Sequence, residues 1–299
     1  MKANSMCISC LLAQHEKKFR AFPDGKRKSE YMKKVLKLLL ERGCEDSAPL
    51  LYEELMELFE AEWGFGDDFS EVKHKFNSLL LDREAEIEAI IEKEDDPLKA
   101  CIRYVCAANY IDFAALGSVS ADTFDRLLEK ARSESVPEDE YSLFLSDLGA
   151  AGSLVYLTDN CGEIVLDKLF IKLIKKRFSG LSITAIVRGG SVINDATMDD
   201  AREVGLSDLV RCIGNGDAAP GTVLSRISPE ATEAIRSADL IISKGQGNFE
   251  SLYGEEGLDP YFLFMCKCEL FVRRFGMKQY SSVFRRGSRI KIADPSTEG

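Results

Sequence analysis

The chain has 299 residues, of which 45% are hydrophobic and 30% charged, so its composition predicts a globular protein with one large domain or two modest ones. A formal net charge of −11 argues against sequence-independent nucleic-acid binding, and no apolar run approaches the roughly 18 residues of a membrane span. The first residues lack the apolar stretch of a secretory signal, so we expect a cytoplasmic protein in which any anionic ligand needs a local positive site.

The first half of the chain, residues 1–149, is predicted to be a helical region. Apolar residues recur there at helical spacing, and turn-forming residues separate the helices. The predicted helices span residues 29–40, 50–63, 72–91, 120–131 and 137–148. The lysines within residues 26–37 indicate a solvated helix face rather than a binding patch.

Two of the nine cysteines form an N-terminal CxxC motif. Cys7 and Cys10 could supply half of a zinc site or form a redox pair, and packing at the start of the first helix is the alternative. A zinc site requires two further ligands, and few candidates exist: His15, His74, Cys44, Cys266 and Cys268. The odd number of cysteines argues against a complete disulfide framework.

A polar pair stands out in the helical region, within residues 108–113. Asn109 and Asp112 are three residues apart, so on a helix they share one face. Between apolar and aromatic neighbours, this pair indicates either the wall of a cavity or a helix end at which Asp112 is a cap.

The pattern changes in residues 150–299, where short β-rich apolar runs alternate with helical stretches. The predicted strands span residues 153–157, 183–187, 209–213, 240–242 and 261–265. The predicted helices between them span residues 163–177, 197–204 and 229–237. Apolar strands that alternate with helices predict an α/β domain with a largely parallel sheet. Residues 294–299 carry no such signal, and we expect a frayed tail.

Ligands of an open parallel sheet bind outside the carboxyl ends of its strands, so the residues that follow each strand are informative. The first strand leads into Asp159 and Asn160, which offer a carboxylate and a carbonyl oxygen suited to Mg²⁺ or Mn²⁺. Gly162 permits close backbone approach, and the helix N-terminus after it favours an anion. The alternative is that Asp159 or Asn160 only caps that helix.

The second strand ends at Arg188 and leads through two glycines to Asn194 and Asp195, just before another helix. This repeats the amide and carboxylate pairing of Asp159 and Asn160 at the neighbouring strand end. Two such pairs at adjacent strand ends are better explained by one shared hard cation than by two unrelated helix caps.

The fourth strand leads into Lys244-Gly245-Gln246-Gly247-Asn248. Two glycines after a lysine follow the logic of phosphate-binding loops, in which exposed amides and one cation surround the anion. The segment is not a Walker A motif, because the required spacing and the following Ser or Thr are absent.

Together these segments resemble the damage-control phosphatase family (domain of unknown function 89), in particular its prokaryotic-type branch, which carries an N-terminal CxxC. The resemblance is specific because the segments keep their order along almost the whole chain, although each is short. They are residues 7–10, 108–113, 159–163, 188–201, 244–252 and 265–269. Cys161 replaces the small Ala or Ser that is usual after the Asp-Asn pair, and we expect this departure to leave a metal site intact.

The resemblance implies a helical N-terminal region packed on a Rossmann-like α/β domain. It implies that Asp159, Asn160 and Asp195 hold Mg²⁺, Mn²⁺ or another divalent first-row ion, and that Lys244 is similar to a lysine that meets the phosphate. The substrates it implies are small phosphorylated metabolites, such as sugar phosphates or damaged side products. The residues predicted on the substrate side are Asn109, Asp112, Arg188, Asn194, Lys244, Gly245, Gly247 and Asn248.

We therefore expect a metal-dependent phosphomonoester hydrolase with Asp159, Glu163 and Lys244 as catalytic residues. Glu163 could be a base for water, whereas direct metal ligation argues against Asp159 as a nucleophile. One alternative is an S-adenosylmethionine-dependent methyltransferase, although the expected glycine-rich loop is absent after the first strand. The other is a non-enzymatic metabolite-binding module or a redox-linked regulatory module. The oligomeric state has no signal in the sequence.

Overall fold

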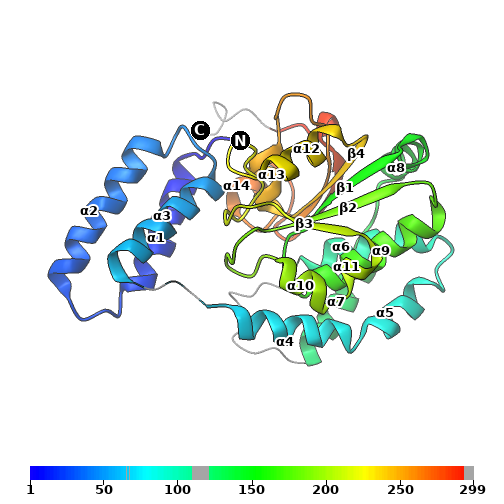
Figure 1. Ribbon diagram of the computed structural model, residues 1–299, viewed down its shortest axis with the longest axis horizontal. Helices are drawn as coiled ribbons and strands as arrows, with labels where there is room; N and C mark the ends of the chain where they lie inside the picture. The colour runs from blue at the N-terminus through cyan, green and yellow to red at the C-terminus, as the bar shows by residue number, and fades with distance from the viewer. Residues whose placement is uncertain (65, 67, 110–120, 293–299) are drawn as a thin grey trace.

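Six strands form one sheet in the computed structural model, which describes residues 1–64, 66, 68–109 and 121–292 (Figure 1). The strands are β1 Ser153–Leu157, β2 Ser182–Val187, β3 Arg211–Gly214, β4 Leu240–Lys244, β5 Tyr261–Met265 and β6 Ser282–Arg286. They lie in the order β3-β2-β1-β4-β5-β6, and β6 alone is antiparallel to its neighbour. The predicted α/β class with a largely parallel sheet is confirmed.

The chain changes its direction of progress across the sheet between β1 and β4. After β1 it adds β2 and β3 on one side, and it then returns to add β4, β5 and β6 on the other. In open parallel sheets this reversal opens a crevice at the carboxyl ends of the strands. Leu157 of β1 lies opposite Ser243 of β4, so the loops that follow these two strands are neighbours.

Fourteen α-helices and one short 3-10 helix occur in the described residues. Eight of them precede the sheet: α1 Ser5–Phe19, α2 Gly25–Arg42, α3 Ala48–Trp63, α4 Ser70–Leu81, α5 Glu84–Ile91, α6 Pro97–Ala108, α7 Ala121–Ser133 and α8 Glu138–Ala150. The others are α9 Glu163–Arg177, α10 Met198–Glu203, α11 Leu206–Leu209, α12 Pro229–Ser237, α13 Gln246–Leu252, α14 Glu269–Phe275 and η1 Gly287–Arg289. None of these helices combines the length and the apolar character that crossing a membrane requires, as far as the described residues go.

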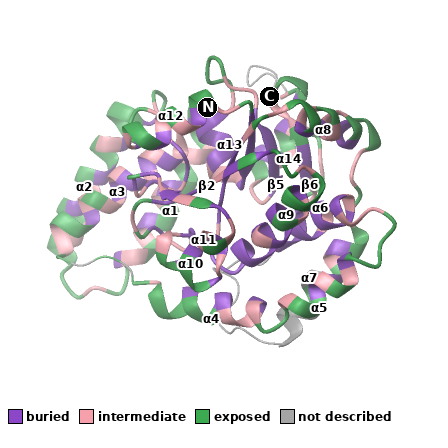
Figure 2. Cartoon of the chain, turned by 45° about the vertical axis from the view of Figure 1, so that its right-hand side comes forward, coloured by how far each residue is buried: buried purple, intermediate pink, exposed green. Residues whose placement is uncertain are grey.

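Different helices cover the two faces of the sheet. Leu154 and Tyr156 of β1 belong to a buried cluster with α6, α8 and α9, whereas Val155 and Leu157 belong to one with α12, α13 and α14. Both faces are apolar because helix layers bury a parallel sheet on both sides. Buried residues are concentrated in the strands and in α6, which ends beside the carboxyl edge of the sheet at its C-cap Asn109 (Figure 2).

Helices α1, α2 and α3 form a bundle with its own aromatic core at one end of the molecule (Figure 1). Asn4 and Asp24 cap α1 and α2 by accepting backbone N–H groups, which defines where these helices begin. Helices α4 to α8 instead share the apolar cluster on one face of the sheet, so this packing crosses residue 150. The division into a helical region of residues 1–149 and an α/β domain of residues 150–299 stays a prediction.

The prediction of a single helix over residues 72–91 is wrong. Helix α4 ends at Leu81, and Asp82 and Arg83 form a turn before α5 begins. Both helices direct apolar residues to the same cluster, so the periodicity continues across the break and conceals it. The predicted tail, residues 294–299, lies outside the described residues.

The edge strand β6 and the helix α14 were not predicted. β6 carries Arg285 and Arg286, and charged residues at a sheet edge weaken the apolar signal of a strand.

Candidate active site

The loops after β1 and β2 are hydrogen-bonded to each other, which brings Asp159, Asn160 and Asp195 together. The Ala196 amide donates to the Asp159 carbonyl at 2.7 Å. Asn160 and Asp195 form an isolated antiparallel bridge beyond the ends of the strands. The two oxygen-rich pairs that follow neighbouring strands in the sequence therefore occupy one place in the fold.

Two backbone conformations shape these loops. Ile193 has a φ of 43°, which is strained for a β-branched residue, and it lies in the turn that presents Asp195. Gly162 has a φ of 68° and opens α9, and its amide donates to the side-chain oxygen of Asn77 on α4 at 2.6 Å. A strained turn and a contact from the helical part thus hold the two loops in place.

Asp159, Asn160 and Asp195 each keep one side-chain oxygen without a hydrogen-bond donor among the described residues. Asp159 Oδ2 accepts from Asn109 Nδ2 at 2.9 Å and from Asn160 Nδ2 at 2.7 Å. Asp195 Oδ2 accepts from Arg188 Nε at 2.6 Å. The remaining oxygens are Oδ1 of Asp159, Asn160 and Asp195, so hydrogen bonds hold each side chain on one side only.

Arg188 lies beside both carboxylates and is almost completely buried. Its Nη1 donates to Asn248 Oδ1 at 2.9 Å and to Thr222 Oγ1 at 3.3 Å, and its Nη2 is 3.8 Å from Asp159 Oδ1. The Asn248 amide group donates to main-chain carbonyls after β1 and at the end of β4. Arg188 and Asn248, both predicted on the substrate side, brace the loops around the site in this structure.

Lys244 at the end of β4 is fully buried and forms ion pairs with Glu163 and Asp167, the latter at 2.9 Å. The two carboxylates project from one face of α9 because they are four residues apart. Tyr156 of β1 donates to the same Asp167 oxygen at 2.6 Å, and the other Glu163 oxygen accepts from Asn160 at 3.1 Å. The Lys244 ammonium therefore faces the interior, behind the loop that follows β1.

Burial dominates the protonation of this cluster. It raises the pKa of Asp159 to about 7, with the charges of Glu163 and Asp195 adding to the effect, and it also raises the pKa of Asp195. Burial raises the pKa of Asp167 to about 6. Burial would raise the pKa of Glu163 too, but the charge and hydrogen bond of Lys244 hold it below its usual value. A cation between Asp159 and Asp195 would stabilise their ionised forms.

Gly245 and Gly247 allow the loop after β4 to approach its neighbours closely. Gly245 has a φ of 81°, and a Cβ there would overlap the Asp159 carboxylate. A Cβ on Gly247 would overlap the Pro220 carbonyl. The Gly245 amide donates to the Leu263 carbonyl at 2.9 Å, so it is not free to bind a phosphate in this structure.

The remaining predicted residues fall in different places. Asn109 is buried against Asp159 and Glu163. Asn194 is partly exposed at the rim of the site. Asp112 lies outside the described residues.

Cys7 is half-buried and Cys10 is exposed on α1. Within the described residues, no group of three or more His, Cys, Asp or Glu side chains is arranged to hold a metal, so the zinc interpretation of this pair lacks its further ligands. The set at the strand ends has two carboxylates, and its third member is the amide of Asn160.

Four residues around the site had no predicted role there, and they are Tyr156, Asp167, Thr222 and Lys267, the last of which lies in the matching segment 265–269. Asp167 carried a signal, because a second acid four residues after Glu163 on a buried helix face is unusual. Lys267 follows β5, and its charge opposes the rise in the pKa of Asp159. Tyr156 is an ordinary strand residue by its pattern, and the loop of residues 214–222, which contains Thr222, has the pattern of an ordinary turn more than that of a pocket wall.

Known proteins resemble the chain over almost its whole length. The sequence profile described as the damage-control phosphatase ARMT1-like domain matches residues 3–283. A damage-control phosphatase of Archaeoglobus fulgidus is 31% identical, covering 93% of this chain and 96% of that protein. A damage-control phosphatase of Pyrococcus horikoshii is 27% identical, covering 96% of this chain and 98% of that protein.

The fold comparison agrees with the sequence comparison. The crystal structure of a DUF89 family protein from Pyrococcus horikoshii superposes with a TM-score of 0.79 and 28% identity, covering 96% of this chain and 99% of that one. The resemblance to this family predicted from the short motifs is confirmed, and the relatives support a phosphatase function. The chain belongs to the damage-control phosphatase family with an ARMT1-like domain.

Proposed function

We propose that this protein is a divalent-metal-dependent phosphatase of small phosphorylated metabolites. The observation that carries the proposal is the pairing of the loops after β1 and β2, which brings Asp159, Asn160 and Asp195 together, each with an Oδ1 atom that accepts no hydrogen bond from the described residues. Two carboxylates and one amide carbonyl are hard donors that suit Mg²⁺, Mn²⁺ or another first-row ion. Their other polar atoms are held by neighbouring side chains, as is usual for metal ligands.

The raised pKa values of Asp159 and Asp195 fit the same site. Two buried carboxylates that are costly to ionise alone gain most from a shared cation. When bound, the ion would polarise a phosphoryl oxygen and offset its negative charge. The overall charge of −11 repels anions, so this local positive centre would determine which anionic ligand enters.

The protein's own residues would divide the remaining work. We assign Lys267, a half-buried cation after β5 whose charge opposes the rise in the pKa of Asp159, to the phosphoryl oxygens. Lys244 is buried, so its role would be indirect: its ion pair with Glu163 would hold that carboxylate in place. Both Glu163 oxygens are hydrogen-bonded and its pKa is lowered, which suits it to orienting Asn160 more than to taking a proton from water.

A phosphatase assay with and without metal tests the proposal. We expect the protein to release phosphate from p-nitrophenyl phosphate, to lose this activity with EDTA, and to regain it with Mn²⁺ or Mg²⁺. Sugar phosphates and other phosphate monoesters then define the substrate class. Undiminished turnover after complete removal of metal would refute the proposal.

A matched pair of variants connects the activity to the site. Asp195→Asn should weaken Mn²⁺ binding and lower kcat/KM by more than about 100-fold. Asp199→Asn is the control, because Asp199 lies four residues further on and its side chain is 93% exposed. Equal behaviour of the two variants would show that the ion, if one binds, binds elsewhere.

A further inference from the structure

A chain of buried hydrogen bonds runs from the centre of the sheet to Asn160. Tyr156 donates to Asp167 at 2.6 Å, Lys244 bridges Asp167 and Glu163, and Glu163 accepts from Asn160 at 3.1 Å. We call this chain the Tyr156–Asn160 relay. Its first four members are no more than 3% exposed, so solvent does not substitute for any of these contacts.

The relay, together with Asp159, decides which atom of the Asn160 side chain is turned away from Glu163. The terminal torsion of an Asn side chain is broad, so the amide can turn over unless its neighbours prevent it. Glu163 Oε2 and Asp159 Oδ2 both accept from Asn160 Nδ2, at 3.1 and 2.7 Å. The carbonyl Oδ1 therefore points away from them, which is the orientation that a metal ligand needs.

The position of Glu163 depends in turn on Asp167. The Lys244 ammonium is shared by two buried carboxylates, and its place between them requires both. If Asp167 were neutral or absent, Lys244 and Glu163 would form a simple pair. Glu163 would then follow the ammonium and loosen its bond to Asn160.

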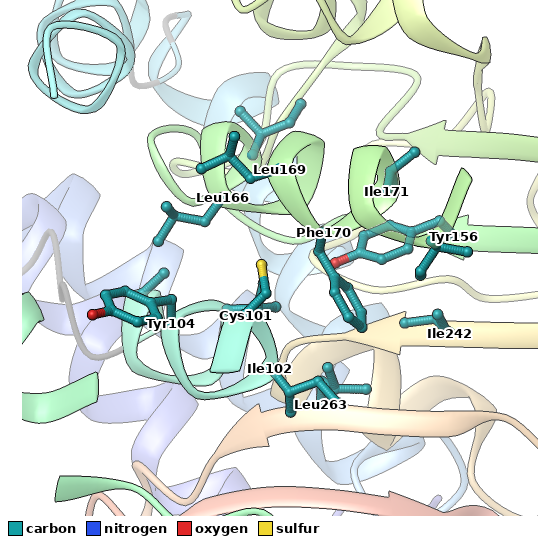
Figure 3. Close-up of a cluster of buried hydrophobic side chains, with 14 of the residues drawn as sticks. Cys101, Ile102, Tyr104, Tyr156, Leu166, Leu169, Phe170, Ile171, Ile242 and Leu263 are labelled. Carbon is teal, nitrogen blue, oxygen red and sulfur yellow. The ribbon is translucent and has the colours of Figure 1, made fainter. Parts of the chain in front are cut away.

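Tyr156 holds Asp167 in place within this arrangement. The Tyr156 hydroxyl and the Lys244 ammonium both donate to Asp167 Oδ1. Asp167 Oδ2 has no hydrogen-bond partner among the described residues, so these two contacts alone hold the carboxylate. The Tyr156 ring packs beside Phe170 of α9, with 6.3 Å between the ring centroids, within the buried apolar cluster that Figure 3 shows. The apolar core thus fixes the hydroxyl, and the hydroxyl fixes the start of the relay.

We propose that Tyr156 and Asp167 are positioning residues, which act through Lys244 and Glu163 to direct the Asn160 carbonyl at a divalent ion. Neither residue would touch the substrate. The inference rests on the proposed function, since it places a metal at Asn160. It adds that two residues buried in the apolar core, Tyr156 and Asp167, contribute to the affinity of the site for the divalent ion.

Two tyrosine variants test the relay. Tyr156→Phe removes the hydroxyl and keeps the ring, and Tyr261→Phe is its control. Tyr261 is equally buried, and it donates to Asp147 at 2.6 Å from the first residue of β5, at the other end of that strand from the site. Calorimetric titration of the metal-free protein should show Mn²⁺ affinity about tenfold weaker in Tyr156→Phe and unchanged in Tyr261→Phe.

Asp167→Asn gives a second measurement. It keeps an acceptor for the tyrosine but removes the charge that faces Lys244, so we expect a larger loss of Mn²⁺ affinity than in Tyr156→Phe. In both variants, kcat at subsaturating Mn²⁺ should fall, and excess Mn²⁺ should restore most of it while KM for the phosphate ester changes little.

The possible outcomes distinguish failure of the relay from failure of the proposed phosphatase function. Unaltered Mn²⁺ affinity in Tyr156→Phe would overturn the relay, and so would an equal loss in both tyrosine variants, which would indicate a general effect on stability. In either case the wild-type protein would still be a metal-dependent phosphatase. Failure of the wild-type protein itself to bind Mn²⁺ would instead overturn the proposed function and the relay with it.

Discussion

The aromatic core of the α1–α3 bundle and the charged cluster at the ends of β1, β2 and β4 are both buried, but they contain opposite kinds of side chain. In the bundle, rings pack edge to face, and burial keeps the one histidine neutral by lowering the pKa of His15 to about 4. In the cluster, burial raises the pKa of Asp159, Asp167 and Asp195, so their ionised forms oppose folding near neutral pH.

This difference indicates what each region is for. Burial of aromatic rings stabilises the folded chain directly, by about 25 cal/mol for each Å² of apolar surface. Burial of several carboxylates around few cations does not stabilise the folded chain in this way, because the cost of removing the charges from water can exceed the gain from pairing them. A cluster that weakens the fold is expected where a ligand, such as the divalent ion that we propose, supplies the missing charge.

The largest effect should come from Asp159→Asn, which separates activity from stability. We expect a loss of kcat/KM of about a thousandfold or more, because the variant removes a carboxylate that we propose as a ligand of the ion. The melting temperature without metal should be unchanged or higher at pH 8, since an ionised buried carboxylate is replaced by a neutral amide. Phosphate release and calorimetric melting measure the two effects, and a large loss of stability would contradict the comparison.

Phe59→Ala should have the opposite effect, which is a loss of stability without a loss of metal binding. Phe59 lies within the aromatic core and is 2% exposed, so its truncation should cost about 3–5 kcal/mol in the free energy of unfolding. Mn²⁺ affinity of the folded protein should stay as in the wild type. Leu40→Ala on α2 is the control, because Leu40 is 87% exposed and its truncation should change stability by less than about 0.5 kcal/mol. Urea unfolding provides the measurement.

A smaller effect is expected where the bundle meets the loop between β3 and α12. Glu53 of α3 is buried beside Asp217 and forms an ion pair with Arg226 at 2.9 Å. Burial, together with the neighbouring Asp217, raises the pKa of Glu53 from 4.5 to about 7. The folded protein therefore retains a proton that the unfolded chain releases above pH 4.5, so stability from this group is lost as pH rises from about 4.5 to 7.

Glu53→Gln should reduce the loss of folding stability that accompanies the rise in pH. Between pH 5 and 8 the wild type should lose about 1–2 kcal/mol more stability than the variant. Glu57→Gln is the control, because Glu57 lies one turn further along α3, also faces Arg226, and is exposed. Parallel pH profiles for wild type and Glu53→Gln, measured by urea unfolding, would show that the carboxyl is ionised in the folded protein throughout.

Local pattern was sufficient for most of the sheet. Strands β1 and β5 and helices α9 and α12 occupy the predicted residues, because apolar periodicity and turn residues act within a few positions of the chain. The Asp-Asn and Asn-Asp pairs were also readable, since parallel strands place their carboxyl ends at one edge of a sheet.

The partners of those residues could not be read from the chain. Asn109 reaches Asp159 across 50 positions, Arg188 reaches Asn248 across 60, and Lys244 reaches Glu163 across 81. No local pattern specifies such contacts, because they arise only when separate strands and helices pack. The sequence alone thus determined which kinds of atom follow each strand. Packing determined which of these atoms accept no hydrogen bond from the described residues and which, such as the Lys244 ammonium, are buried in ion pairs.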